Sequence, residues 1–286
     1  MKILVTGAKG QLGSELKERG AGLTEHEFLF SDLPELDITD PVAVEHVFAY
    51  FKPQVLLNCA AYTAVDKAET EPEKAMLVNA TAVGNLAVAC QSRNVHLIHI
   101  STDYIFDGTN HKPYLETDLA NPVSAYAKSK HGGELVLLNS GCNATIIRTS
   151  WLYSSYGHNF VKTILRIARE KGSLNVVTDQ VGTPTYAGDL ATMILSNLEK
   201  MISRIGCTVF NYSNEGVASW YDFALAATEI AGIPCTIHPI PTSKYPTPAT
   251  RPFYSVLDKE KIRSEMGIRI PHWRESLSHC IHKINP

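Results

Sequence analysis

Several signatures of other protein classes are missing from this chain of 286 residues. No run of about 18 apolar residues occurs, which argues against a membrane-spanning helix, and the N-terminal apolar run reaches glycine too early for a signal peptide. Six cysteines are scattered without a CxxC pair, so neither a disulfide framework nor a zinc site is supported. HExxH is absent as well. We therefore expect a cytoplasmic protein with reduced thiols and no metal ligands.

An excess of positive charge is also absent. The net charge is -3 and 19% of the residues are charged, so the composition indicates neither a nucleic-acid partner nor an anionic membrane. With 44% hydrophobic residues, a chain of this length can bury a full core. The profile is that of a soluble globular protein and fits a small-molecule enzyme.

Short apolar or β-branched runs alternate with longer segments of helical period through the first half. The predicted strands are "KILVT", "HEFLFS", "QVLLNCA", "HLIHIS" and "ATIIRTS". The segments of helical period between them include "QLGSELKERG" (11–20), "PVAVEHVFAYF" (41–51) and "EKAMLVNATAVGNLAVAC" (73–90), and a later helix is predicted over "AGDLATMILSNLEK" (187–200). This alternation predicts βαβ units and a parallel sheet with helices on both faces. We expect a doubly wound α/β domain over 1–150 and a smaller α/β lobe over most of 151–286, from which some segments return to the first domain. The proline-rich "IPTSKYPTPATRPFYS" is predicted to be an ordered loop.

The first strand runs directly into "TGAKGQLG", in which Gly7, Gly10 and Gly13 are three residues apart where a helix should begin. Glycine permits a tight turn and close approach of the backbone to a pyrophosphate, and the helix N-terminus attracts phosphate. A glycine motif in this context predicts dinucleotide binding. A P-loop is excluded because the spacing differs and no Gly-Lys-Ser/Thr follows.

The choice between NADPH and NADH stays open at the sequence level. Asp32 follows the second strand, where an acidic residue accepts hydrogen bonds from the adenine ribose and favours NAD. Lys9 in the glycine loop could instead pair with a 2′-phosphate. Asp37 and Ile38 could lie against the adenine, whereas Asp40 is expected to cap the next helix.

Candidate catalytic groups follow the fourth strand. "HISTDYIFDG" delivers Thr102 to the carboxyl edge of the sheet, where ligands bind in such folds. "YAKSK" places Tyr126 and Lys130 on one face of the next helix. Because a phenol has a pKa of about 10, we expect the Lys130 cation to favour its phenolate. Thr102 would hold a substrate carbonyl oxygen while Tyr126 gives it a proton and a nicotinamide gives hydride.

These residues resemble the extended short-chain dehydrogenase/reductase family, and more closely its members that act on a dTDP-4-keto sugar. The resemblance covers nearly the whole chain. It rests on "TGAKGQLG", "NCAAYTAVDKAE", "STDYIFDG", "YAKSKHGGE", "RTSWLY", "NFVKTIL", "DQVGTPT" and "PTPATRP". First-half motifs are shared by many sugar-nucleotide epimerases and dehydratases, whereas "AVDKAE", "DQVGTPT" and "PTPATRP" are particular to these reductases.

The resemblance implies a Rossmann domain for NAD(P)H and a C-terminal lobe for a thymidine-diphosphate sugar. The implied reaction reduces the C4 keto group of dTDP-4-dehydro-L-rhamnose to dTDP-L-rhamnose, the last step of a pathway that supplies cell-surface polysaccharide. Thr102, Tyr126 and Lys130 match the catalytic triad of the family, and Lys130 also holds the nicotinamide ribose.

Further contacts are expected from the motifs and the resemblance together. Cofactor contacts are expected at Gly7, Gly10, Gln11, Leu12, Gly13, Ser31, Asp32, Asp37, Ile38, Cys59, Ala60, Ala61, Tyr62, Asn79, Tyr126 and Lys130. Substrate contacts are expected at Thr63, Val65, Thr102, Asp103, Tyr104, Trp151, Asn159, Phe160 and Arg251. A guanidinium fork such as that of Arg251 suits a diphosphate.

Some of these reductases are described as dimers joined through magnesium held by glutamates. Glu15 matches the first of those positions, but the second falls at Gly188, with Asp189 one place out of register. We therefore assign no metal ligand, and a monomer and a homodimer remain alternatives.

Two other functions fit part of the pattern. A sugar-nucleotide epimerase or dehydratase shares the glycines, the "STD" strand end and YxxxK, but a dehydratase carries an acidic pair directly after the threonine, and here Asp103 is followed by Tyr104. A non-catalytic regulatory subunit, such as the beta subunit of methionine adenosyltransferase, also resembles these reductases. Retention of Thr102, Tyr126 and Lys130 argues against that alternative.

Overall fold

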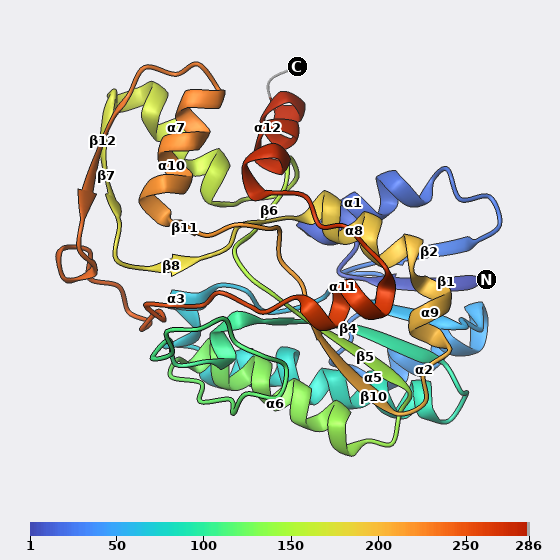
Figure 1. Cartoon of the computed structure of the whole chain (residues 1–286). Helices are drawn as coiled ribbons and strands as arrows, with labels where there is room; N and C mark the ends of the chain where they lie inside the picture. The colour runs from blue at the N-terminus through green and yellow to red at the C-terminus, as the bar shows by residue number, and fades with distance from the viewer. Residues whose placement is uncertain (285–286) are drawn as a thin grey trace.

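A six-stranded parallel β-sheet organises the chain in the computed structural model, which describes residues 1–284 (Figure 1). Its strands are β1 (Lys2–Thr6), β2 (Glu27–Ser31), β3 (Val55–Asn58), β4 (His96–Thr102), β5 (Ala144–Thr149) and β10 (Cys207–Asn211). Across the sheet the order is β10-β5-β4-β3-β1-β2, and every neighbouring pair is parallel. The strands predicted for the first half are present, and the doubly wound α/β architecture is confirmed.

Alternate residues of each strand face two separate hydrophobic layers. In β1, Ile3 and Val5 belong to one layer and Leu4 to the other, and all three are fully buried. Helices on both faces of the sheet explain why its strands read as continuous apolar runs. One face is covered by α1 (Gln11–Gly20), α8 (Ala187–Ser196), α9 (Leu198–Ile202) and α11 (Glu260–Met266), and the other by α2 (Pro41–Phe51), α5 (Ala82–Gln91) and α6 (Ala125–Asn139).

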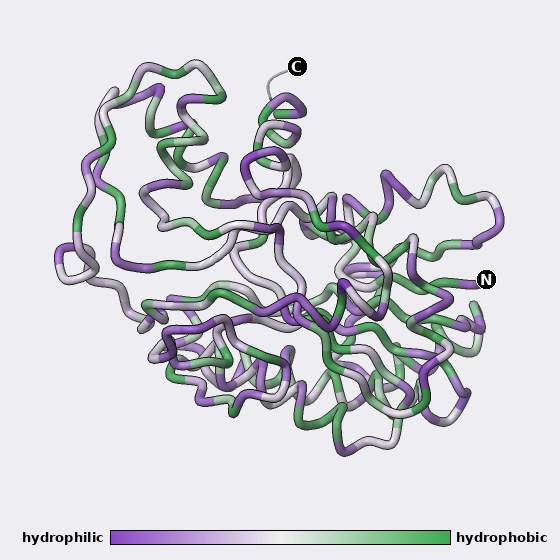
Figure 2. The backbone as a smooth tube through the Cα atoms, in the orientation of Figure 1, coloured by the Kyte–Doolittle hydropathy of each residue, from purple (hydrophilic) through white to green (hydrophobic). Residues whose placement is uncertain are grey.

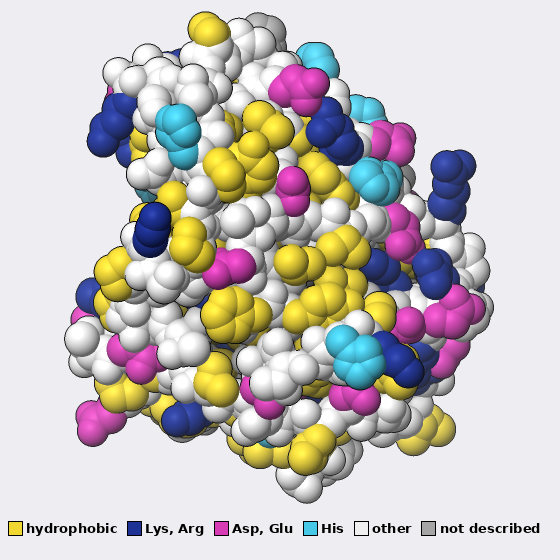
Figure 3. All heavy atoms as spheres, turned by 60° about the vertical axis from the view of Figure 1, so that its left-hand side comes forward, with side chains coloured by type: hydrophobic (Ala, Val, Ile, Leu, Met, Phe, Trp, Pro, Cys, Tyr) yellow, Lys and Arg dark blue, Asp and Glu magenta, His cyan; other side chains and the backbone are white. Residues whose placement is uncertain are grey.

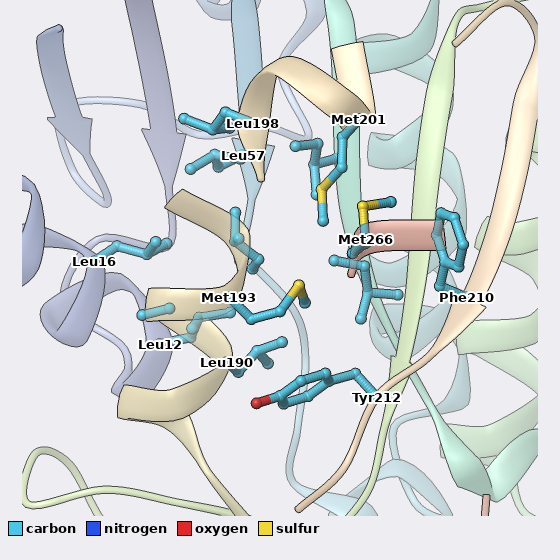
Figure 4. Packing of buried hydrophobic residues seen from close by; sticks show 14 of the residues in the cluster. Leu12, Leu16, Leu57, Leu190, Met193, Leu198, Met201, Phe210, Tyr212 and Met266 are labelled. Atoms are coloured by element: carbon cyan, nitrogen blue, oxygen red, sulfur yellow. The ribbon is translucent and has the colours of Figure 1, made fainter. Parts of the chain in front are cut away.

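The layer between α1, α8 and the sheet is shown in Figure 4. Leu16 of α1 and Leu190 of α8 pack in the same cluster as Leu57 of β3, and all three are almost fully buried. Each such side chain contributes roughly 1.5–3 kcal/mol through burial. Hydropathy along the backbone (Figure 2) shows hydrophobic positions along the central strands. This packing holds the start of α1 firmly against β1.

Strands β1 and β3 are neighbours in the sheet, and the direction of the strand order changes between them. From β1 the chain continues to β2 on one side, and from β3 it continues to β4 on the other. The connections from β1 and β3 leave on opposite faces of the sheet, so a crevice opens beyond their carboxyl ends. The loops after Thr6, Asn58 and Thr102 all meet at this edge.

The helix predicted over 73–90 is interrupted. It consists of α4 (Pro72–Met76), a π-helical segment η1 (Leu77–Thr81) and α5. In η1 the backbone at Asn79 comes so close to α6 that a Cβ on Gly133 would collide with the Asn79 carbonyl oxygen. A π segment adds one residue to a turn and often lies at a functional site. Its effect here is to aim Asn79 at the loop that follows β3.

A second group of helices forms the smaller lobe at the upper left of Figure 1. It contains α7 (Phe160–Lys171), α10 (Trp220–Ile230), α12 (Trp273–Ile284) and the parallel pair β7 (Ser173–Val177) with β12 (Thr236–Ile240). Its core joins Tyr153, Phe223 and Trp273. Two short strand pairs connect it to the large sheet: β6 (Leu152–Tyr153) with β9 (Thr185–Tyr186), and β8 (Val181–Gly182) with β11 (Ala218–Ser219).

Two expectations for the second half need correction. The helix predicted over 187–200 is broken at Asn197, whose side-chain amide donates to the Met193 carbonyl and separates α8 from α9. The proline-rich segment is not wholly loop, because Ile240 ends β12 and Thr242–Lys244 form one 3₁₀ turn, η3. No helix within residues 1–284 combines the length and apolarity needed to cross a membrane.

Candidate active site

A cleft of about 720 Å³ lies at the carboxyl edge of the sheet, between the sheet and the smaller lobe. Figure 3 shows apolar side chains gathered in the middle of one face of the molecule. Most of the predicted site residues line the cleft. These are Gly7, Gly10, Gln11, Leu12, Gly13, Asp32, Asp37, Ile38, Cys59, Ala60, Ala61, Thr63, Val65, Thr102, Asp103, Tyr104, Tyr126, Lys130, Trp151 and Asn159.

Five predicted residues lie behind the cleft wall or beside it. The Ser31 carbonyl accepts from the N–H of Ala8 and so anchors the glycine turn. Asn79 holds the backbone N–H and carbonyl of Tyr62 through two hydrogen bonds, at 2.8 and 3.0 Å. Phe160 stacks on Phe223 in the smaller lobe. Arg251, the fifth, is described below.

The glycine turn is built for close approach of backbone. Gly7 has a φ of +66°, which a side chain would strain. A Cβ on Gly13 would collide with the backbone of Gly7 and Ala8, so α1 can pack tightly against the turn only with glycine there. Gly10 is the N-cap of α1 and offers no side-chain acceptor. The turn and the helix N-terminus therefore fit a pyrophosphate.

Asp32 lines the cleft, and Lys9 is hydrogen-bonded to it from the glycine turn. The Asp32 carboxylate accepts from the N–H groups of Lys9 and Leu33, both at 2.8 Å. The Lys9 ammonium donates to the Leu33 carbonyl at 2.5 Å and pairs with Glu35 at 3.3 Å. The carboxylate is thus fixed by backbone donors, while the ammonium is tethered above it.

The phenol of Tyr126 is half-buried in the cleft, beside the hydroxyl of Thr102. Burial raises the pKa of Tyr126 to about 12, and the hydrogen bond from Thr102 opposes that rise by favouring the phenolate. Thr102 itself caps the 3₁₀ turn η2 (Asp103–Ile105), where its oxygen accepts from the N–H of Tyr104 at 3.2 Å. At neutral pH the Tyr126 phenol therefore carries its proton and is ready to donate it.

Lys130 is buried one turn further along α6. Its ammonium donates to the Ile100 carbonyl at 2.7 Å and lies 3.4 Å from Nε2 of His99. Burial lowers the pKa of Lys130 to about 8. The hydrogen bond from Thr102 favours the phenolate of Tyr126, and the expectation that the Lys130 cation favours it as well stays a prediction.

A buried ion pair that the sequence interpretation missed anchors α6 to the sheet. Glu134 of α6 and Arg148 of β5 form an ion pair at 2.8 Å with almost no exposure to solvent. Ser101 donates to the same carboxylate, and Arg148 also donates to the Glu116 carbonyl at 3.0 Å. The available signal was an arginine inside the apolar run "ATIIRTS", which requires a buried partner.

Two tryptophans line the opposite wall of the cleft. Trp151 has a φ of +47°, which is unusual for a large residue, and its indole lies against Gly182, where a Cβ would come within 2.7 Å of the ring. Trp220 stacks on Trp151 and also lines the cleft. Trp220 was not predicted as a site residue, because it belongs to a different element from Trp151 and no motif links the two.

Asn159 connects the smaller lobe to the glycine turn. Its side-chain oxygen caps α7 by accepting from the N–H of Lys162 at 3.1 Å, and its amide donates to Gln11 at 3.0 Å and to the Ser154 carbonyl at 2.7 Å. The N-terminus of α7 and the N-terminus of α1 therefore meet at the cleft.

Arg251 forms a bidentate ion pair with Asp66 of α3 (Val65–Ala68), at 3.0 and 2.8 Å. The Arg251 guanidinium holds the pKa of Asp66 below its usual range. This pair ties the proline-rich segment to the loop that follows β3. Arg251 does not line the cleft in this structure.

The carboxylates considered as magnesium ligands already accept hydrogen bonds or an ion pair from other side chains. Glu15 is ion-paired with Arg19 and accepts from Ser154 at 2.6 Å. A Cβ at Gly188 would collide with the same guanidinium, and Asp189 accepts from Asn214 at 2.7 Å. Because the Arg19 cation already neutralises Glu15, these residues do not fit a magnesium ion. Within residues 1–284, no group of three or more His, Cys, Asp or Glu side chains is placed to hold a metal.

Comparisons with known proteins agree with this geometry. Residues 1–285 match the family described as RmlD substrate binding domain. The dTDP-4-dehydrorhamnose reductase of Aggregatibacter actinomycetemcomitans is 42% identical, over 96% of this chain and 97% of its own. A solved structure of a dTDP-4-dehydrorhamnose reductase from Clostridium acetobutylicum has a TM-score of 0.95 at 40% identity and covers 100% of both chains.

A second solved structure, of dTDP-4-dehydrorhamnose reductase from Bacillus anthracis in complex with NADP, has a TM-score of 0.93 at 36% identity and covers 99% of each chain. The chain therefore belongs to the dTDP-4-dehydrorhamnose reductase family of extended short-chain dehydrogenases/reductases.

Proposed function

We propose that this chain reduces the C4 keto group of dTDP-4-dehydro-L-rhamnose to give dTDP-L-rhamnose, with NADPH or NADH as reductant. This reaction is the final step of dTDP-rhamnose biosynthesis for cell-surface polysaccharide. The observation that carries the proposal is one continuous cleft that joins the glycine turn to Thr102, Tyr126 and Lys130. The relative from Bacillus anthracis, which binds NADP, supports NADPH as the first cofactor to test.

In this proposal the side chains of the protein supply a proton to the substrate and position the cofactor. The nicotinamide, when bound, supplies the hydride for the substrate carbon. Tyr126 donates its proton to the keto oxygen, and the Thr102 hydroxyl stabilises the phenolate that remains. Lys130 holds the nicotinamide ribose through its ammonium and adds positive charge near that phenolate.

The two parts of the chain divide the ligands between them. Residues 1–150 bind the dinucleotide, mainly at Gly7 to Gly13, Asp32 and the loop after β3. Residues 151–286 form mainly the substrate lobe, although α8, β10 and α11 return to the sheet domain. The first half adds the substrate contacts expected at Thr63, Val65 and residues 102–104. Trp151 contacts the sugar, and Asn159 and Arg251 act toward the nucleotide. For Arg251 this requires exchange of its Asp66 partner for the diphosphate.

The protein works in the cytoplasm as a monomer or a homodimer, and its substrate is a small dTDP-sugar. Its net charge of -3 agrees with the absence of a nucleic-acid partner from the proposal.

The test is a reduction assay with purified protein, in which nicotinamide absorbance is followed with dTDP-4-dehydro-L-rhamnose, using NADPH and NADH in parallel. We expect oxidation of the cofactor that depends on the keto sugar. The matched control is Tyr126→Phe, which removes only the phenol hydroxyl and should lower kcat by about 10² to 10⁴ while cofactor affinity persists. Good cofactor binding without turnover in the wild-type protein would favour a regulatory subunit, and turnover of a nucleotide sugar by epimerisation would favour the neighbouring enzymes.

A further inference from the structure

A chain of buried polar side chains runs beneath the cleft across three strands and onto α6. The Thr6 hydroxyl lies 2.7 Å from Oδ1 of Asn58, Nδ2 of Asn58 lies 3.0 Å from Nδ1 of His99, and Nε2 of His99 lies 3.4 Å from Nζ of Lys130. None of the four residues is more than 2% exposed. Each hydrogen bond in this chain must therefore be made within the protein.

The orientation of the Asn58 amide is determined by a backbone group. The N–H of Ala60 donates to Oδ1 of Asn58 at 3.2 Å, and a backbone N–H cannot accept a hydrogen bond. Oδ1 therefore faces Ala60 and Thr6, and the amide nitrogen faces His99. Because Nδ2 of Asn58 is a donor, Nδ1 of His99 must be the acceptor and carries no proton.

The proton of His99 then has only one place. Full burial and the nearby Lys130 hold the pKa of His99 well below its usual range, so the ring is neutral. A neutral imidazole with an unprotonated Nδ1 carries its proton on Nε2. This N–H points toward Nζ of Lys130, so an ammonium there would face another donor, whereas a neutral amine would accept the hydrogen bond.

We propose that His99 is a positioning residue that disfavours the ammonium form of Lys130, and that Asn58 gives it this role by fixing its tautomer. The proposal rests on the function proposed above, because it assigns Lys130 to the cofactor. Lys130 is thereby kept ready to exchange a proton near the working pH, as suits a group beside an acid–base step.

Other groups around Lys130 act differently. Glu134 on its own helix favours the ammonium, but its charge is shared with Arg148. Cys59, after β3, stays a neutral thiol because burial raises its pKa to about 12. The Ile100 carbonyl of β4 accepts from Nζ, and Tyr126 lies on the same helix as an uncharged phenol. His99 is the group among these that presents an N–H to Lys130.

The first experiment measures the affinity for NADPH against pH, by energy transfer from tryptophan to the nicotinamide. Affinity should fall as pH rises through the pKa of Lys130, because the ammonium binds the ribose. In His99→Met the opposing N–H is gone, so this fall should move to higher pH by about one unit. If NADPH affinity of a folded His99→Met protein fell at the same pH as that of the wild type, the proposal would be overturned.

The matched control is His96→Met. His96 is a buried histidine three residues earlier on β4, and its Nε2 lies 2.9 Å from the Thr145 hydroxyl rather than near Lys130. Loss of this ring should not change the pH at which NADPH affinity falls. If His96→Met shifted this pH equally, removal of any buried histidine ring from β4 would have the same result, and the role proposed for His99 would be overturned.

The second experiment observes the tautomer directly. Long-range ¹H–¹⁵N spectra of histidine-labelled protein without ligands should show the His99 proton on Nε2, and finding it on Nδ1 would overturn the proposal. In Asn58→Asp the carboxylate still accepts from Thr6 and Ala60 but also accepts from His99, so the proton should move to Nδ1. Nε2 then becomes an acceptor for the ammonium, and the fall in NADPH affinity should shift to higher pH.

The carboxylate of Asn58→Asp also acts on Lys130 through its charge, so the substitution is repeated in the His99→Met background. There the tautomer cannot contribute, and the remaining shift is that of the charge alone. The shift of Asn58→Asp should be larger when His99 is present, and an equal shift in both backgrounds would contradict the tautomer mechanism. Neither experiment uses the keto sugar, so failure of the reduction assay with these results intact would remove the proposed function alone.

Discussion

The indole rings of Trp151 and Trp220 lie parallel, with their centroids 3.6 Å apart and 6° between their planes. Trp151 belongs to the segment after β5, and Trp220 is the first residue of α10. The stack therefore holds α10 of the smaller lobe against the cleft wall, where both rings are half-buried. It presents an apolar surface at the place where we expect the sugar.

Trp220→Ala removes one ring of this stack and should raise KM for the sugar nucleotide about tenfold, since an aromatic pair contributes about 0.5–1.5 kcal/mol beyond burial. Cofactor affinity should change little, because Trp220 belongs to α10 of the smaller lobe and not to the glycine turn. The exciton-coupled circular dichroism of the stacked indoles should also disappear. Trp220→Phe retains a ring and is the control for lost packing; an Ala variant with unchanged KM would place the stack outside the substrate site.

Gly13→Ala should weaken NADPH binding by more than about tenfold, because its Cβ would collide with the backbone of Gly7 and Ala8 and displace the turn. Titration of the cofactor by fluorescence measures the effect. Gly22→Ala is the matched control, since nothing lies within 4 Å of a Cβ at that position. Equal affinities for the two variants would contradict the assignment of this turn to the dinucleotide.

Arg148→Met should destabilise the fold by about 3–5 kcal/mol, because it leaves the Glu134 carboxylate buried without its cation. Chemical denaturation measures the change. Arg166→Met removes an exposed partner of Glu170 and should cost less than about 1 kcal/mol. A small effect at Arg148 would mean that Ser101 alone is sufficient to satisfy Glu134.

Asp103 should make stability depend on pH in the direction opposite to most carboxylates. Burial raises its pKa to about 7, so the folded state holds a proton that the unfolded chain releases near pH 4. Stability from this group is therefore complete below about pH 4 and is lost progressively as pH rises toward 7.

Asp103→Asn cannot ionise and should avoid that loss. Relative to the wild type, its free energy of unfolding should gain on the order of 3 kcal/mol between pH 4 and pH 8. Denaturation curves at several pH values test this difference. A difference between the two proteins that does not vary with pH would show that Asp103 ionises normally.

Elements governed by local rules were predictable from the sequence. Helices α1 and α2 begin and end where predicted, because Gly10 and Asp40 mark their starts and the apolar period is regular; Asp40 caps α2 as expected. The residues that line the cleft from strand ends were predictable for a similar reason, since parallel strands bring their carboxyl ends together.

Features made by contacts between distant segments were not predictable. The π turn at Asn79 depends on the close approach of α6 at Gly133, which no periodicity in 73–90 reveals. The pairing of Arg251 with Asp66 joins residues 185 positions apart, and that of Arg148 with Glu134 joins a strand to the helix before it. Tertiary packing determines which charged residues become partners, and a single sequence does not show which segments will pack together.

The place of β10 at the edge of the sheet has a consequence for synthesis on the ribosome. Residues 207–211 pair with β5, and α11 then packs in the same hydrophobic layer. As the chain emerges from its N-terminus, the edge of β5 stays unpaired and its apolar residues stay uncovered until these late segments have been made. The nascent cofactor-binding half must therefore remain open, and in need of protection from aggregation, until almost the entire polypeptide has left the exit tunnel.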